Sequence, residues 1–240
     1  MVIVFIFSLL DFSFVFMFLT ILMPALNEEE SIVQTIKNIP LAKLKETGYD
    51  AEILIVDGGS TDKTAEIAKS LGARVIQSER GYGRQYRLGF REAKGDVIAT
   101  ADSDNSYPME EIPKLLKILE KENLDFISTN RFSGLSKGSM RLLNYFGNKV
   151  LTFFANFLFG LELEDSQSGM WVFKKRALGK INLTSNGMPL SQEIKIEAFK
   201  KLRAQEVNSS YKKRVGEVKL RMFKDGWENL KHLFIKKSRS

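Results

Sequence analysis

Two carboxylates stand one residue apart in the stretch TADSDNSYP, residues 100–108. They are Asp102 and Asp104, and they follow directly on the apolar run VIATA. Like charges this close repel each other, so one of the two would hold a proton unless a cation neutralises the pair. Mg²⁺ is commonly bound by one or two carboxylates together with substrate phosphates. The pair therefore predicts a metal site that carries a diphosphate, with capping of the next helix as the structural alternative.

Short apolar runs alternate with helical patterns along the first half of the chain. We expect strands at 18–23, 51–57, 73–78, 96–101 and 125–130, with helices beginning near residue 29 and covering 60–72, 83–95 and 108–123. Alternation of this kind implies right-handed crossovers and a largely parallel sheet with helices on both faces.

Polar segments follow each of these strands in turn. They are PALNEEE, DGGSTD, SERGYGR, DSDNS and Arg131. In an open α/β sheet, ligands bind beyond the carboxyl ends of the strands. We therefore expect these segments to form one ligand site.

The segment VDGGSTDKT has the features of a nucleotide contact between a strand and a helix. Its glycines allow close backbone approach, and the N-terminus of the following helix attracts negative charge. Asp57 could accept hydrogen bonds from a base or a ribose. A plain tight turn before a capped helix is the structural alternative. GYGR does not match the spacing G-x-G-x-x-G, which argues against a dinucleotide cofactor.

Composition excludes several classes of chemistry. The chain has no cysteine, so disulfides, thiolate metal sites and cysteine nucleophiles are absent. Its single histidine, His232, lies in a basic tail. Histidine-ligated zinc and Ser-His-Asp catalysis therefore do not fit this chain.

The positive charge is concentrated at the C-terminus. Residues 200–240 contain 13 Lys or Arg and four Asp or Glu, a net charge of +9, whereas the whole chain carries +7. The tail over 221–240 interleaves its lysines with aromatic and aliphatic residues. This pattern favours an anionic membrane surface over nucleic acid.

Two further segments are strongly apolar. Residues 1–17 are long enough to span a bilayer but contain Asp11 and are followed by no Lys or Arg before Lys37. A membrane segment and a true start at Met17 both remain open. The run VLTFFANFLFGL, residues 150–161, fits either a core helix or a helix lying on a membrane face.

Four motifs occur in a fixed order: PALNEEESI, ILIVDGGSTDKT, GDVIATADSD and DSQSGMWVFKK. In this order and spacing they resemble a family 2 glycosyltransferase of the GT-A fold. The later segment YKKRVGEVKL resembles the dolichol-phosphate, or polyprenyl-phosphate, mannose and glucose synthases. The resemblance covers residues 19–220 and implies an α/β fold with a nucleotide-binding, mostly parallel sheet flanked by helices. The domain would span 18–220, with an amphipathic, membrane-facing extension over 221–240.

The resemblance also implies individual roles. The nucleotide sugar would contact Pro24, Leu26, Glu28, Val56, Asp57, Gly58, Asp102 and Ser103. Gly58 stands where many relatives carry a second aspartate. Mg²⁺ or Mn²⁺ would be held by Asp102, Asp104 and Ser106, the last where mannose synthases often carry glutamine. The acceptor phosphate would meet Arg131, Arg214, Lys219 and Ser168, and the catalytic set would be Asp104, Arg131 and Arg214.

The acceptor decides which chemistry is needed. A phosphate monoester is already anionic at neutral pH, because its second pKa is about 6, so it requires cations rather than a general base. The sequence thus predicts a metal-dependent, inverting transfer of a hexose from a donor of the GDP-mannose or UDP-glucose type to a polyprenyl phosphate. We expect this at the cytoplasmic face of a membrane, without nucleic acid.

Two alternatives stay open. The first is transfer to a hydroxyl of a glycan or lipid, which would need a base such as Asp165 or Glu193. The second is a non-catalytic nucleotide-binding membrane module.

Overall fold

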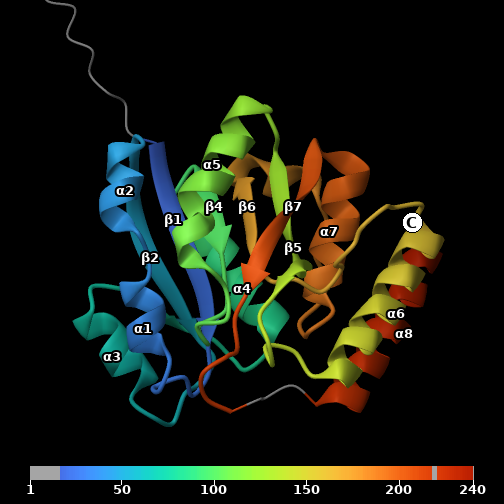
Figure 1. Cartoon of the computed structure of the whole chain (residues 1–240), viewed down its shortest axis with the longest axis horizontal. Coiled ribbons are helices and arrows are strands. Elements are labelled where there is room, and N and C mark those ends of the chain that lie inside the picture. The colour runs from blue at the N-terminus through green and yellow to red at the C-terminus, as the bar shows by residue number, and fades with distance from the viewer. Residues whose placement is uncertain (1–16, 218–220, 240) are drawn as a thin grey trace, which may run out of the picture.

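The computed structural model describes residues 17–217 and 221–239 (Figure 1). The apolar segment 1–16 and the tripeptide 218–220 lie outside the described residues. The expectations for a membrane segment or a later start at the N-terminus, and for Lys219 at the acceptor, therefore concern residues that the structure does not describe.

A seven-stranded sheet forms the centre of the fold, in the order β3-β2-β1-β4-β6-β5-β7. The strands are β1 (Met17–Ala25), β2 (Tyr49–Asp57), β3 (Arg74–Gln77), β4 (Val97–Thr100), β5 (Phe126–Leu135), β6 (Trp171–Lys174) and β7 (Ala204–Tyr211). β6 pairs antiparallel with β4 and β5, while the other pairings are parallel. The largely parallel α/β sheet predicted from the sequence is confirmed.

Helices cover both faces of the sheet (Figure 1). They are α1 (Ile32–Lys37), α2 (Leu41–Glu46), α3 (Thr64–Ser70), α4 (Tyr82–Glu92), α5 (Ile112–Lys121), α6 (Leu142–Phe159), α7 (Leu190–Lys201) and α8 (Met222–Ser238), with 3₁₀ turns at Met109–Glu111 and Lys175–Lys180. Apolar residues of α1, α2, α3 and α5 share one core cluster with the sheet. Residues of α4 and α7 share the other, as two-sided coverage of a parallel sheet requires.

Helices α6 and α8 lie side by side at the margin of the molecule (Figure 1). Ala155 and Phe159 of α6 pack with Leu233 of α8 and with α7 in a small third core cluster. The outer face of the pair is apolar and exposed, with relative exposures of 57% for Phe146, 63% for Phe153 and 68% for Trp227. Segment 150–161 thus has one face in a core and one face that is exposed. Within the described ranges, no helix combines the length and apolarity that a bilayer crossing needs.

Glycine allows α4 to pack closely on the sheet. A Cβ at Gly89 would overlap the side chain of Leu22 on β1 and lie 3.0 Å from Val56 Cγ2 on β2. Both neighbours are fully buried and have no room to withdraw. The contact therefore sets the distance between α4 and the strands that end at the ligand-binding edge.

We expect Gly89→Ala to destabilise the protein by about 1–3 kcal/mol, because overpacking a dense core forces strain. Gly147→Ala on α6 is the matched control, since a Cβ there meets nothing within 4 Å. Replacing a helical glycine at such an open position should stabilise by about 0.5–1 kcal/mol. Urea denaturation of both variants measures the two effects, and equal stabilities would contradict this account of α4 packing.

Candidate active site

The site lies where strands β1, β2 and β4 end together. Ala25 at the end of β1 pairs with Asp57 at the end of β2, and Thr100 at the end of β4 pairs with Leu22 of β1. The loops that leave these strands therefore meet at one edge, as the sequence predicted. The segment after β7 joins them from the far end of the chain.

The turn that carries the two aspartates is anchored through Ser103. Its hydroxyl donates to the Pro24 carbonyl at 2.6 Å. Its own carbonyl accepts from the hydroxyls of Ser31 at 2.8 Å and Thr35 at 3.0 Å. Ser103 and Pro24, which were both predicted to contact the nucleotide sugar, thus hold the turn against β1 and α1. This anchoring keeps the flanking carboxylates at the edge of the sheet.

Asp104 is held by hydrogen bonds, and Asp102 has a shifted pKa. Asp104 Oδ1 accepts from the Ser106 amide at 3.0 Å and from the Ser106 hydroxyl at 2.5 Å. Burial and the charge of Asp104 raise the pKa of Asp102 to about 7, although Arg131 and Arg214 oppose the shift. Burial disfavours the charged form of a carboxylate, and a second carboxylate nearby adds to that effect.

The pair therefore fits a divalent cation. Within the described residues, no three Asp, Glu or His side chains form a metal-binding group. Two carboxylates suffice for Mg²⁺ where substrate phosphates complete its coordination.

Arg214 bridges the aspartate turn to the β1 loop. Its Nη2 lies 3.2 Å from Glu28 Oε1 and its Nη1 lies 3.5 Å from Asp104 Oδ2. The backbone amide of Val215 donates to the Asp104 carbonyl at 3.0 Å, and that of Lys212 to the Ser106 carbonyl at 2.9 Å. Arg214 Nε is buried without a hydrogen-bond partner. The guanidinium therefore supplies positive charge to Asp104 on the side opposite Ser106.

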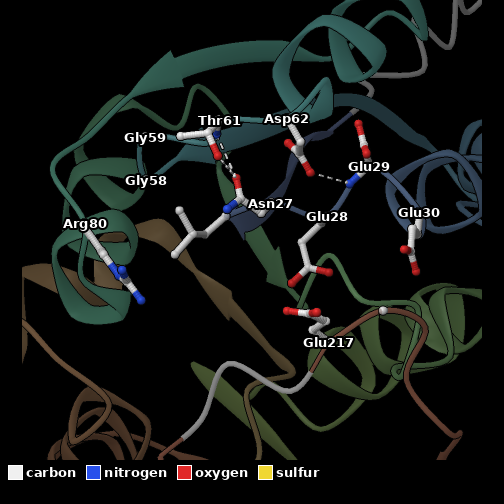
Figure 2. A pocket seen from close by; sticks show the side chains of 12 residues that line it. Asn27, Glu28, Glu29, Glu30, Gly58, Gly59, Thr61, Asp62, Arg80 and Glu217 are labelled. Atoms are coloured by element: carbon white, nitrogen blue, oxygen red, sulfur yellow. Dashed lines mark hydrogen bonds between the residues drawn. The ribbon is translucent and has the colours of Figure 1, made fainter.

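A cavity of about 480 Å³ opens beside this bridge (Figure 2). Leu26, Glu28 and Gly58 line it, and the resemblance had assigned these three residues to the nucleotide sugar. Arg80 and Glu217 also line the cavity. The sequence analysis named the segments SERGYGR and YKKRVGEVKL that contain them, but not these two residues individually.

Figure 2 shows the Glu28 and Glu217 carboxylates directed toward each other and Arg80 on the far side. Arg80 is exposed, and an arginine next to Glu79 in SERGYGR does not by itself mark a binding residue.

Five of the residues predicted to contact the nucleotide sugar do not line the cavity: Pro24, Val56, Asp57, Asp102 and Ser103. Val56 is fully buried in the core. Asp57 is 1% exposed, and its carboxylate accepts hydrogen bonds from the Ser60 hydroxyl and amide. In this structure Asp57 therefore shapes the turn between β2 and α3.

The glycine at position 58 has a steric reason. A Cβ there would lie 2.9 Å from Gln85 Cδ. Gln85 Nε2 cannot easily move, because it donates to the carbonyls of Ala25 at 2.9 Å and Val56 at 2.8 Å. Gln85 thus occupies the space that a second aspartate would need. This contact was invisible in the sequence, since α4 and the β2 loop are far apart along the chain.

Arg131 lies on β5, and its side chain is held by Asp165. Its Nε donates to Asp165 Oδ2 at 2.7 Å and its Nη2 to Oδ1 at 2.9 Å. The Arg131 guanidinium carbon also lies 5.2 Å from the Tyr211 ring centroid. Burial alone would raise the pKa of Asp165, but the charges of Arg131 and Lys195 lower it to about 2. The pair is thus permanently ionised and rigid at neutral pH.

Lys195 was missed by sequence analysis. It lies on α7, is fully buried, and donates to the Asp165 carbonyl. Burial lowers its pKa to about 8 while Asp165 opposes the shift. The signal was present: Lys195 lies between Ile194 and Ile196 in a helix whose neighbouring residues are buried. A lysine there needs a carboxylate or carbonyl partner.

Glu193 and Ser168 are also enclosed. Glu193 is fully buried and accepts from the amides of Thr184 at 3.0 Å and Ser185 at 2.9 Å. The Ser168 hydroxyl lies 2.7 Å from that of Thr129 and is fully buried. Both residues therefore hold loops in place within this structure.

Comparison with known proteins identifies the family. The family described as Glycosyl transferase family 2 matches residues 20–181. The low-salt glycan biosynthesis hexosyltransferase Agl6 of Haloferax volcanii is 37% identical over 221 residues, which cover 90% of this chain but 53% of that protein. The dolichyl-phosphate hexose transferase of the same organism is 35% identical over 212 residues, covering 87% of this chain and 89% of that protein. The chain thus spans about half of the first relative and most of the second.

Solved structures agree on the fold. Glucosyl-3-phosphoglycerate synthase from Mycobacterium tuberculosis, in complex with Mn²⁺, UDP-glucose and phosphoglyceric acid, superposes with a TM-score of 0.73 at 21% identity. The match covers 92% of this chain and 80% of that one. The chain therefore belongs to glycosyl transferase family 2 and has the GT-A fold.

Proposed function

We propose that this glycosyltransferase moves a hexose from a nucleoside diphosphate sugar to a polyprenyl phosphate, with inversion at the anomeric carbon. The observation that carries the proposal is the state of the two candidate bases. Asp165 is bound to Arg131, Glu193 is bound to the 184–185 backbone, and both are fully buried. A hydroxyl acceptor needs a base within reach, whereas a phosphate monoester does not. The acceptor class in the name of the dolichyl-phosphate hexose transferase supports the same choice.

We assign the donor to the cavity beside Glu28 and Gly58, within a domain over 18–220. Asp102 and Asp104 would hold Mg²⁺ or Mn²⁺ there, and the Mn²⁺–UDP-glucose complex of the mycobacterial synthase supports a divalent ion in this fold. When bound, such an ion offsets the charge on the departing diphosphate. Ser106 orients Asp104 through two hydrogen bonds, which is the role we give it in place of direct coordination.

We assign the acceptor phosphate to Arg131 and Arg214. Asp165 accepts hydrogen bonds from Nε and Nη2 of Arg131, and no described residue accepts one from its Nη1. Arg214 contributes a buried Nε without a partner. These donors can hold an anionic acceptor against the negative donor, which is the main requirement of base-free transfer.

Arg214 also occupies one oxygen of Asp104. A divalent cation and a guanidinium would compete for that oxygen, because both are drawn by the same charge. Cation binding would therefore release Arg214 toward the acceptor.

The function test uses the purified full chain, farnesyl phosphate and a panel of radiolabelled UDP- and GDP-sugars. We expect one donor to yield label that extracts into organic solvent, in a reaction that needs Mg²⁺ or Mn²⁺. Asp104→Asn should abolish transfer while thermal unfolding stays cooperative. Label appearing on farnesol or on a glycan hydroxyl would favour the alternative acceptor, and full activity in excess EDTA would remove the metal.

Arg214→Ala should lower transfer to farnesyl phosphate by roughly ten- to a hundredfold, the value of a lost charge-assisted hydrogen bond. The same change should tighten Mn²⁺ binding measured by electron paramagnetic resonance, because the competing guanidinium is gone. Arg214→Lys should recover transfer only in part if the contact is bidentate.

Lys212→Ala is the matched control for Arg214. It removes one positive charge from the same segment, and its ion pair is with exposed Glu110, away from the aspartates. We expect little change in Mn²⁺ affinity or transfer. Weaker Mn²⁺ binding in Arg214→Ala than in this control would place Arg214 with the groups that hold the donor.

We further propose that the outer face of α6 and the tail 221–240 contact the membrane. The exposed apolar side chains of this face are Leu142, Leu143, Phe146, Val150, Phe153, Phe157, Phe223 and Trp227. The exposed lysines of α8 would meet anionic headgroups. This places the enzyme peripherally where a polyprenyl phosphate presents its head, and we assign that surface to the cytoplasmic side.

We expect the full chain to sediment with anionic vesicles at low salt. The double variant Phe223→Ala, Trp227→Ala should lower the affinity for these vesicles about tenfold or more. Each aromatic side chain contributes about 1.5–3 kcal/mol when it leaves water. Leu41→Ala is the control, because Leu41 is an exposed apolar residue on α2, at the opposite side of the molecule. Wild-type protein that stays in the supernatant would contradict membrane contact.

A further inference from the structure

Lys149 is the only charged residue of α6, in the sequence LLNYFGNKVLTFFANFLF. Its ammonium lies 4.1 Å from the Phe132 ring centroid and 5.9 Å from that of Tyr145. It donates to the Glu164 carbonyl at 3.3 Å. The Glu164 carboxylate is directed to the Asn130 amide instead. Within the described part of the chain, Lys149 therefore has a carbonyl and two rings as partners but no carboxylate.

Arg131 also lies near the Phe132 ring. Its guanidinium carbon is 6.0 Å from the Phe132 centroid, so the two cations are no farther apart than the two ring distances together. The carbonyl that binds Lys149 belongs to the residue just before Asp165, the partner of Arg131. Asp165 already balances the charge of Arg131. The second cation is left to attract an anion from outside the protein.

The surroundings of Lys149 say what kind of anion fits. Its neighbours along the outer face of α6 are Phe146, Val150 and Phe153, which are all more than half exposed. An inorganic ion would use the ammonium but leave these side chains in water. A phosphate attached to an apolar chain would use both, with the head at Lys149 and the chain on α6.

From this geometry we propose that Lys149 binds the phosphate of the acceptor lipid where the lipid passes from the apolar face of α6 to Arg131. The proposal rests on the proposed function, since it assigns a further residue to the same acceptor. Lys149 contacts the substrate head and aligns it, and the transferring atoms remain between Arg131, Arg214 and the donor. Both cations lie within cation–π distance of the Phe132 ring, which attracts each of them.

The first test measures binding of three probes to the full chain by calorimetry: farnesyl phosphate, farnesol and inorganic phosphate. We expect farnesyl phosphate to bind most tightly. Lys149→Met should weaken it roughly ten- to a hundredfold and leave farnesol unchanged, because methionine keeps the apolar stem over Phe132. Lys149→Arg should restore most of the affinity. Lys43→Met on α2 is the control, as Lys43 is exposed and lies at the far side of the fold.

The second test measures steady-state transfer to farnesyl phosphate. Lys149→Met should raise the KM for farnesyl phosphate and leave the KM for the nucleotide sugar unchanged. A purely structural role would alter both constants and would not be rescued by arginine.

The outcomes separate the two proposals. Wild-type transfer combined with unaltered farnesyl phosphate binding in Lys149→Met would overturn the role of Lys149 alone. Lys149-dependent binding without any transfer would support the phosphate site and overturn the proposed reaction. Equal affinity for inorganic phosphate and farnesyl phosphate would show that α6 takes no part in recognising the lipid.

Discussion

Negative charge gathered at the end of β4 is the constraint around which the site is arranged. Asp102 and Asp104 are fixed there because Ser103 ties the turn to β1 and α1. Neighbouring cations must then come from elsewhere in the chain. Arg214, in the segment after β7, reaches Asp104. Arg131, on β5, partly offsets the rise in the pKa of Asp102. The last strands of the sheet are thus bound electrostatically to the first.

The same distribution of charge separates the proposed donor side of the site from the proposed acceptor side. On the donor side carboxylates outnumber cations, which suits a diphosphate only when a divalent ion accompanies it. On the proposed acceptor side Arg131 is fixed by the Asp165 carboxylate, and Lys195 donates to the backbone carbonyl of Asp165. A buried ion pair is weak evidence of stability. Here its consequence is chemical, because it leaves the Asp165 carboxylate unable to act as a base.

Much of this was accessible from the sequence. Strand–helix alternation predicted the parallel sheet, and polar residues after successive strands predicted the binding edge, since both are local patterns. Strand β6 was missed because WVFK is short and follows a polar loop, and β7 because AQEVNSSY is polar and lies at the margin of the sheet.

Two of the contacts that correct individual roles are long-range. Gln85 filling the space over Gly58 and Arg214 reaching Glu28 depend on how distant segments meet. No sequence pattern carries that information. The resemblance named the residues at this edge of the sheet, but packing decided which of their atoms remain available to a ligand.

The antiparallel strand β6 has an evolutionary consequence. It lies between β4 and β5 and starts at the same sheet edge where β4 ends. The chain from β5 through α6 to β6 therefore leaves that edge and returns to it, while the cavity proposed for the nucleotide sugar is built mainly from residues before 81. The length and sequence of α6 can therefore change without disturbing β1 and β2, whose following loops line that cavity. The proposed acceptor side can thus evolve separately from the proposed donor side.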